Sequence, residues 1–453
     1  MKNRLNEETV LFFSVLKWFF LSTIIGLIAG TGATIFLKLL TWGIRTAAGY
    51  KYYFLFLPAA MLLTAAAVKY LAPDAEGHGT EKVIEAVHKR SGKIKLLVVP
   101  VKLVTTILTI SFGGSAGKEG PCAQIGSGLA SGFADVFRFN DRDRKKIVIC
   151  GLSAGFASVF GTPIAGAIFG IEVLVVGQLM YDVLLPSFIA GIISYQVSSH
   201  FGITYFYKPL DFLPVFNEYF FIKVVLSGIF FGIVAFLFIE AYKLAHRAFG
   251  RIKTLWWIKP VIAGLIVALP VLFTGTKYLG LGLWHIESFL GGEHSAWYDP
   301  LLKIFFTSIT LCGGGSGGVV TPIFFIGSSA GSFFSSFMGV DTATFAAIGM
   351  VALLAGAANT PIAASIMSIE LFGPKIAPYA AVACIISFLM TGHRSIYSSQ
   401  LLGMSKSKSL DTDLGIEISK TQTSSPKAGD YLTIIKILFL KLFKKDNKKQ
   451  SKP

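Results

Sequence analysis

The stretch GGSAGKEGP at residues 113–121 returns as GGSGGVVTP at residues 314–322, aligned without a gap at an offset of 201 residues. A second pair follows, because TPIAGAIFGIE at 162–172 returns as TPIAASIMSIE at 360–370, at an offset of 198 residues. Shared small residues alone would fit close helix packing, but the repeated Ile-Glu ending goes beyond such a pattern. The chain therefore contains two related halves.

The composition places these halves in a membrane. Of 453 residues, 53% are hydrophobic and 15% are charged, whereas about 25% are charged in soluble domains. This profile excludes a soluble enzyme and favours one membrane-embedded body. Apolar stretches able to cross about 30 Å of hydrocarbon, whole or in two halves, run over 18–42, 52–71, 94–112, 147–177, 180–201, 219–248, 255–275, 300–312 and 343–391.

The charge balance fits the same interpretation. Lys and Arg number 41 against 25 Asp and Glu, a formal net charge of +16. In a soluble protein this excess would suggest nucleic-acid binding, but cytoplasmic loops of multi-span proteins are also rich in Lys and Arg. The basic runs at 142–146 and 436–452 are typical of such loops, so we expect no nucleic-acid partner. A removable signal peptide is not expected either, because the first twenty residues carry acids.

Glycine and proline interrupt the apolar stretches at 113–121, 161–163, 313–322 and 360–361. Broken helices are tolerated in a membrane where they line a protein cavity. Breaks at corresponding places in two halves predict a transport site where the repeats meet, commonly with the halves inverted. The sequence shows the repeat and leaves its inversion open.

The predicted organisation has five parts. They are a cytoplasmic N-terminal segment at 1–17, a first membrane repeat at 18–205, a connection at 206–218, a second membrane repeat at 219–404 and a basic cytoplasmic tail at 405–453. The apolar end of this tail, from residue 431, is too short to span a bilayer. It fits a surface-lying helix and a disordered basic tail equally well.

Glu119 is the one acid within 113–121. A carboxylate inside a membrane is costly and its usual reason is function. Free N–H groups at a helix start, expected around Pro121, would favour either this carboxylate or an anion in its place, and that competition is a gate. The facing loop at 317–322 has no charge and no essential side-chain donor, so we expect it to bind through backbone amides. Such a site suits an anion better than a cation.

A third glycine-bounded helix start reads GHGTE at 77–81. His78 fits a helix cap or a surface residue and, beside the other two loops, equally fits pore lining. The loop at 113–121 lacks the spacing of a nucleotide-binding P-loop. Glu172 and Glu370 occupy equivalent repeat positions, which favours a structural role. No catalytic constellation, metal site or cofactor site is expected.

These residues resemble the CLC family of chloride channels and chloride/proton antiporters over about residues 15–400. GKEGP at 117–121 resembles the family signature G-K/R-E-G-P. GHGTE at 77–81 stands in the place of the family loop G-S-G-I-P, and GVVTP at 318–322 is similar to G-x-F-x-P. Tyr397 falls where the family has its pore tyrosine.

The resemblance implies an all-α, multi-pass integral membrane protein of the plasma or bacterial inner membrane. It implies a homodimer in which two inverted repeats of broken, tilted helices form an anion pore in each subunit. Glu119 would be the gating glutamate, which enters and leaves an anion site as it loses and gains a proton. The implied anion-binding positions are His78, Gly79, Gly117, Lys118, Gly120, Val319, Val320 and Tyr397.

Three departures from the family loops concern selectivity: His78 replaces the pore serine, Glu81 a proline and Val320 a phenylalanine. A fourth concerns protons, because Val173 stands where family antiporters carry an internal proton-transfer glutamate. This valine favours a passive chloride channel over a chloride/proton antiporter. The antiporter stays open, with Tyr397 or His78 as proton carrier.

Fluoride export is disfavoured, because the central loops resemble the chloride-type members more. From another functional class, a membrane scaffold whose lysine-rich tail binds anionic lipid or a partner remains an alternative. The intact Glu119 speaks against it.

Overall fold

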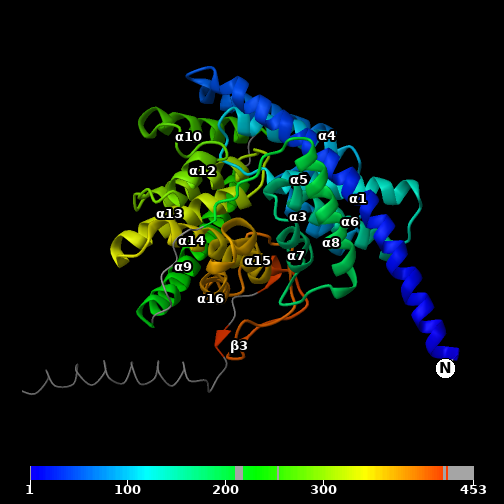
Figure 1. Cartoon of the computed structure of the whole chain (residues 1–453). Helices are drawn as coiled ribbons and strands as arrows, with labels where there is room; N and C mark the ends of the chain where they lie inside the picture. Colours follow the sequence, from blue (N-terminus) through cyan, green and yellow to red (C-terminus); the bar gives the residue numbers. More distant parts are fainter. Residues whose placement is uncertain (1, 210–217, 253–254, 422–424, 427–453) are drawn as a thin grey trace, which may run out of the picture.

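The computed structural model describes residues 2–209, 218–252, 255–421 and 425–426, and the side chains from residue 6 onward (Figure 1). The first half contains α1 (Lys2–Ala48), α2 (Leu57–Leu71), α3 (Gly79–Lys89), α4 (Val98–Ser111), α5 (Glu119–Val136), α6 (Asp141–Phe160), α7 (Pro163–Glu172) and α8 (Leu184–His200). The second half contains α9 (Glu218–Arg251), α10 (Ile258–Thr274), α11 (Leu283–Leu290), α12 (Asp299–Cys312), α13 (Val320–Met338), α14 (Thr342–Ala358), α15 (Pro361–Phe372) and α16 (Ala377–Met390).

Short elements connect these helices. The 3₁₀ turns are η1 (Tyr53–Phe56), η2 (Pro73–Ala75), η3 (Tyr181–Val183), η4 (Pro374–Ile376) and η5 (Ile418–Lys420). Two small sheets pair β1 (Val175–Val176) in parallel with β2 (Leu401–Leu402), and β3 (Leu410–Asp411) antiparallel with β4 (Ser425–Pro426). The described residues thus form an all-α architecture with eight α-helices in each half, which confirms the predicted fold class.

Matched caps set the helix breaks in the two halves. The Asn140 side chain accepts the Asp143 N–H at the start of α6, and Asp341 does the same for Thr344 at the start of α14. Both helices end in the left-handed conformation, at Gly161 and Asn359. A Thr-Pro pair then starts α7 and α15. The predicted breaks at 161–163 and 360–361 are therefore confirmed.

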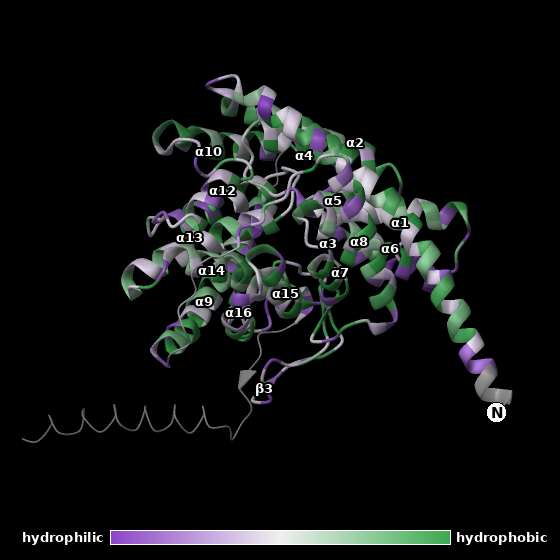
Figure 2. Cartoon of the chain, in the orientation of Figure 1, coloured by the Kyte–Doolittle hydropathy of each residue, from purple (hydrophilic) through white to green (hydrophobic). Residues whose placement is uncertain are grey.

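The molecule exposes apolar surface where lipid is expected. Asn6–Ala48, Tyr53–Leu71, α9 and α13 are long and apolar enough to cross a membrane, and shorter apolar helices complete the body. Large side chains such as Phe20, Trp42 and Phe273 are exposed, the last by 92%. Figure 2 shows hydrophobic residues along most of α1, with hydrophilic ones gathered near its N-terminal end and in loops.

Helix α1 begins earlier than the apolar pattern predicts. It starts at Lys2 and runs through the predicted limit at residue 17. The reason is local, since the chain has no glycine or proline before Gly26, so nothing interrupts the helix in its polar first turns.

Reciprocal contacts relate the two halves. The Glu172 carboxylate accepts the N–H groups of Ile362 and Ala363 at 3.0 and 2.8 Å. Glu370 accepts those of Ile164 and Ala165 at the same two distances. Each carboxylate thus caps the first turn of a helix in the other half, as expected for partners related by a two-fold axis.

Equivalent loops lie on opposite sides of the molecule, so the repeats are inverted. Lys102 donates to the carbonyls of the loop at 75–77, and its repeat equivalent Lys303 donates to those at 278–280. The loop at 278–280 lines a cleft beside Arg45, at the C-terminal end of α1. The loop at 75–77 leads into α3, whose His88 near the C-terminal end lies within range of Lys145. This is the other side, where the N-terminal part of α1 lies and Lys17 pairs with Asp143 at 2.7 Å.

Candidate functional site

The three glycine-bounded loops meet in the interior. His78 forms a parallel bridge with Gly317, and Gly117 forms an antiparallel bridge with Gly318. In the second bridge each N–H donates to the other residue's carbonyl at 2.7 Å. The loops at 77–81, 117–121 and 318–322 are therefore adjacent, as a shared pore site requires.

Hydroxyl groups on α4 and α12 hold two of these loops in place. The Ser115 N–H donates to the Thr310 hydroxyl at 3.1 Å, and the Ser316 N–H donates to the Thr109 hydroxyl at 3.0 Å. In the first contact the loop belongs to the first half and the hydroxyl to the second, and in the second contact this is reversed. Each glycine-rich loop is thus anchored on a helix of the other half, with no charged group needed inside the membrane.

Glu119 occupies the point where the two loops face each other. It is fully buried in the first turn of α5. Its Oε1 accepts the Val320 N–H at 2.5 Å, and its Oε2 accepts the Thr321 hydroxyl at 2.7 Å. Both donors belong to the first turn of α13, where the helix dipole and free N–H groups favour negative charge.

This geometry corrects the expectation that the loop at 317–322 binds through backbone amides alone. Thr321 supplies a side-chain donor to Glu119. The sequence analysis counted no essential side-chain donor in this loop, because the sequence does not show which group the Thr321 hydroxyl reaches. Here Thr321 lies within the helix, and the group that its hydroxyl reaches comes from the opposite repeat.

Glycine at the predicted positions allows neighbouring backbones and the Glu119 carboxylate to approach one another closely. A Cβ on Gly117 or Gly318 would collide with the Glu119 carboxylate oxygens, and a Cβ on Gly79 would collide with the Gly120 carbonyl. The Gly117 N–H itself is engaged with the Gly318 carbonyl. These glycines therefore let three backbones converge on one carboxylate, and direct anion binding by their amides remains a prediction.

Two predicted side chains bring unpartnered polar atoms to the same region. His78 is the buried N-cap residue of α3, but its side chain makes no capping bond. Its ring centroid lies 5.5 Å from that of Tyr397 and 5.8 Å from that of Tyr242. Within the described part of the chain, His78 Nδ1 and the Tyr397 hydroxyl are buried and have no hydrogen-bond partner. The Thr80 hydroxyl lies near the Tyr397 hydroxyl, but the two do not meet the geometry of a hydrogen bond. Buried polar atoms of this kind are expected to receive a ligand or water.

The remaining predicted residues flank this centre. Val319 is buried as the N-cap residue of α13. Val173 is buried after α7, and its carbonyl accepts the Gln400 amide at 2.8 Å. Lys118 is half-buried and lines a cleft of about 860 Å³ between the end of α1 and the segment at 276–285. The cleft carries further basic side chains, namely Lys38, Arg45, Lys277 and His285.

Lys102 is a functional candidate that the sequence analysis missed. It is fully buried and donates to the Ala75 carbonyl at 3.1 Å and to that of Gly77. Lys102 lies directly beside the loop that carries His78, and in its protonated form it would favour an anion there. The signal was present in the repeat, because Lys303 stands 201 residues later in an equally apolar segment.

Residues 60–392 match the protein family described as voltage gated chloride channel. The chain belongs to this family. The chloride/fluoride channel protein of Pseudomonas syringae pv. tomato is 36% identical over 412 residues, which cover 89% of this chain and 91% of that protein. The voltage-gated ClC-type chloride channel ClcB of Shigella flexneri is 29% identical over 345 residues, covering 71% and 79%.

Solved structures agree with this assignment. A CLC-type fluoride/proton antiporter superimposes with a TM-score of 0.81 at 30% identity, covering 86% of this chain and 98% of that one. A slow cyanobacterial Cl⁻/H⁺ antiporter shares the fold, with a TM-score of 0.72 at 20% identity over 83% and 94%. The resemblance to the CLC family is thus confirmed, and the chain is an integral membrane protein for anion transport.

Proposed function

We propose that the chain exchanges a small halide for protons across the membrane, with fluoride preferred to chloride and Glu119 as the gate. The observation that carries this proposal is the position of the Glu119 carboxylate between the Val320 amide and the Thr321 hydroxyl. A halide needs the same donors, because it must replace its lost hydration. Carboxylate and halide therefore compete for one place.

The donor geometry favours fluoride. The donors stand 2.5 and 2.7 Å from carboxylate oxygens, and fluoride is closer than chloride to such an oxygen in size and in strength as an acceptor. The names of two relatives, a chloride/fluoride channel protein and a fluoride/proton antiporter, support this choice. This choice differs from the expectation based on the residue types of the loops, because residue types do not give the distances between these donors and a group from the opposite repeat.

Proton exchange follows from the same competition. A protonated Glu119 has no charge for the α13 helix start to hold, so it yields the place to the halide. When the halide leaves, the Glu119 carboxyl must lose its proton before the carboxylate can return to this place. If the halide enters from the same side to which the proton is released, each cycle moves the two in opposite directions.

A passive channel is the second candidate. Val173 is buried and carries no proton-accepting group, and one relative is named a channel protein. In that case Glu119 would exchange its proton with the solution on one side only. The homodimer and the lipid-binding role of the tail also stay predictions, and residues 427–453 lie outside the described part of the chain.

The deciding experiment uses protein in liposomes loaded with fluoride or chloride. Halide efflux is followed with an ion-selective electrode and proton movement with a pH probe, with protein-free liposomes as a control for leak of neutral HF. We expect outward halide flow to drive protons inward, faster with fluoride. Glu119→Gln should keep halide flow but remove its pH dependence and the proton movement. Halide flow without proton movement in the unmodified protein would establish the channel, and faster chloride flow would refute the fluoride preference.

A further inference from the structure

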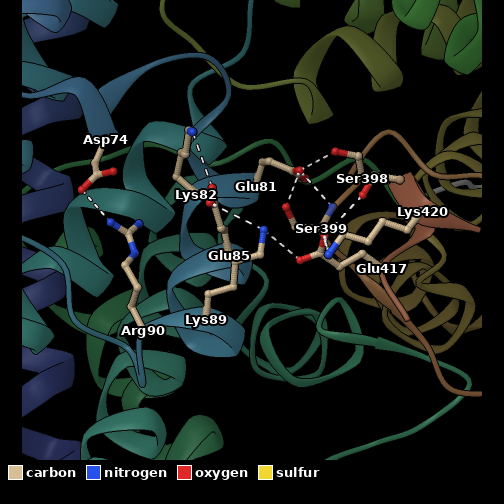
Figure 3. Close-up of polar contacts among 11 residues, drawn as sticks. Asp74, Glu81, Lys82, Glu85, Lys89, Arg90, Ser398, Ser399, Glu417 and Lys420 are labelled. Atoms are coloured by element: carbon tan, nitrogen blue, oxygen red, sulfur yellow. Dashed lines mark hydrogen bonds and ion pairs between the residues drawn. The ribbon is translucent and has the colours of Figure 1, made fainter. Parts of the chain in front are cut away.

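Glu81 joins the first turn of α3 to the segment that follows Tyr397 (Figure 3). Its Oε1 accepts three hydrogen bonds, from the Ser398 hydroxyl at 2.7 Å and from the N–H and hydroxyl of Ser399 at 2.9 and 2.7 Å. Its Oε2 is buried and has no hydrogen-bond partner among the described residues. A purely structural link is complete with Oε1, so the second oxygen calls for another explanation.

Glu81 also lies between the buried centre and water. Towards the centre, the Tyr397 hydroxyl lies within electrostatic range of both the Glu119 and Glu81 carboxylates. Towards water, Lys89 pairs with Glu417 at 2.9 Å, and the Lys89 side chain is 46% exposed (Figure 3). Glu81 thus lies within electrostatic range of Tyr397 on one side and about two helical turns from the exposed Lys89 on the other.

This water-exposed side is the one where the N-terminal part of α1 lies. His88, at the end of α3, contacts the Leu174 carbonyl at 3.0 Å and lies within range of Lys145. Lys145 belongs to the basic run at 142–146, which the charge pattern assigns to the cytoplasm. The Glu81 side of the pore is therefore the cytoplasmic side.

Charged and titratable groups surround Glu81 from three elements. On α3 itself, the Lys82 and Lys89 cations lie within electrostatic range of it. From α9, the Tyr242 phenol lies within electrostatic range, and after α16 the Tyr397 phenol does. Two cations and two phenols leave Glu81 as the carboxylate of this group, so it is the member suited to take up and release a proton.

We propose that Glu81 is the internal proton acceptor of the exchange cycle, a role that rests on the proposed halide/proton function. As Glu119 returns to its place, its carboxyl loses a proton and becomes a carboxylate. The Glu81 carboxylate gains that proton on Oε2, with the Tyr397 hydroxyl within electrostatic range of both carboxylates. Glu81 then releases the proton to cytoplasmic water beside Lys89 and Glu417. It supplies the carboxylate that position 173 lacks.

Glu81→Gln tests this role with little structural change, because the amide oxygen can still accept the bonds from Ser398 and Ser399. We expect halide flow to remain and halide-driven proton movement to fall by about a hundredfold, the scale of a lost proton-transfer group. The matched control is Glu85→Gln, one turn along the same helix, where the carboxylate pairs with Lys82 and Lys89. This control should leave both movements unchanged.

Each outcome decides the role of Glu81. Unchanged proton movement in Glu81→Gln overturns it, and so does an equal loss of halide and proton movement, which would show a structural role. Failure of the proposed function gives a different result, because the unmodified protein would then move halide without protons. Coupled transport in both the unmodified protein and Glu81→Gln refutes only the inference about Glu81.

Discussion

Replacing Thr321 with valine should make the gate open at higher pH. The substitution keeps the shape of the side chain and removes the hydroxyl that donates to Glu119 Oε2 at 2.7 Å. A hydrogen bond to a charged group contributes about 1.5 to 3 kcal/mol. Because about 1.4 kcal/mol corresponds to one pH unit, the midpoint of pH-dependent halide flow should rise by about 1 to 2 units.

The sign follows from which form of Glu119 the hydroxyl stabilises. The Thr321 hydroxyl stabilises the carboxylate, so loss of this hydroxyl destabilises the closed, charged form and leaves the neutral form untouched. Glu119 is then protonated and released at a lower proton concentration, and halide flow begins at a less acidic pH. The halide also loses one donor, which lowers the maximal flow without moving this midpoint in the opposite direction.

The assay is halide efflux from liposomes at a series of pH values. Thr344→Val on α14 is the matched control, because the Thr344 hydroxyl is buried and has no hydrogen-bond partner within the described residues. It should leave the midpoint in place. A midpoint that stays fixed or falls in Thr321→Val, with Thr344→Val unchanged, would contradict the assignment of this hydroxyl to the gate.

Three further predictions concern other contacts. Gly117→Ala should displace the gate carboxylate, which its Cβ would meet, and so raise halide flow at alkaline pH; unchanged flow would argue against it. Glu172→Ala and Glu370→Ala should each cost about 0.5 to 2 kcal/mol as lost helix caps, seen as lower thermal stability with equal proton-to-halide ratios. The hydrogen bond from Lys89 lowers the pKa of Glu417. The ion pair therefore stabilises the fold at pH values above the ordinary glutamate pKa, and this stabilisation is lost as the pH falls through the lowered pKa of Glu417. Proteolysis near residue 417 should become faster over that pH range.

The sequence predicted the repeat architecture well because its signals are local. Breaks before Pro163 and Pro361 depend on the residues at the break itself, and the structure places the helix ends there. The equivalence of Glu172 and Glu370 likewise needed only an alignment of the two halves. What each carboxylate touches was out of reach, because each partner lies about 190 to 206 residues away.

The site was harder to predict for the same reason. Proximity of the loops at 117–121 and 318–322 followed from the repeat, and that of the loop at 77–81 from the family resemblance. The role of the Thr321 hydroxyl depends on how two helix starts dock. The sequence marked Glu81 as a departure from the family loop. Its proposed role depends on Ser399, which donates to it, and on Glu417, which pairs with Lys89, and both lie more than 300 residues away. Such contacts carry no periodic signal in the chain.

The proposed gate arises from a difference between the repeats at one aligned position. Residue 119 plus the offset of 201 is residue 320, so the amide that holds Glu119 belongs to its own repeat equivalent, Val320. Two glutamates facing each other across the two-fold axis would repel, and one would have to stay neutral. Two valines would leave both helix starts open and the pore without a pH-sensitive group. A single carboxylate opposite a bare amide gives a site that one charge, either fixed or diffusing, can fill at a time, and this is the condition for exchange.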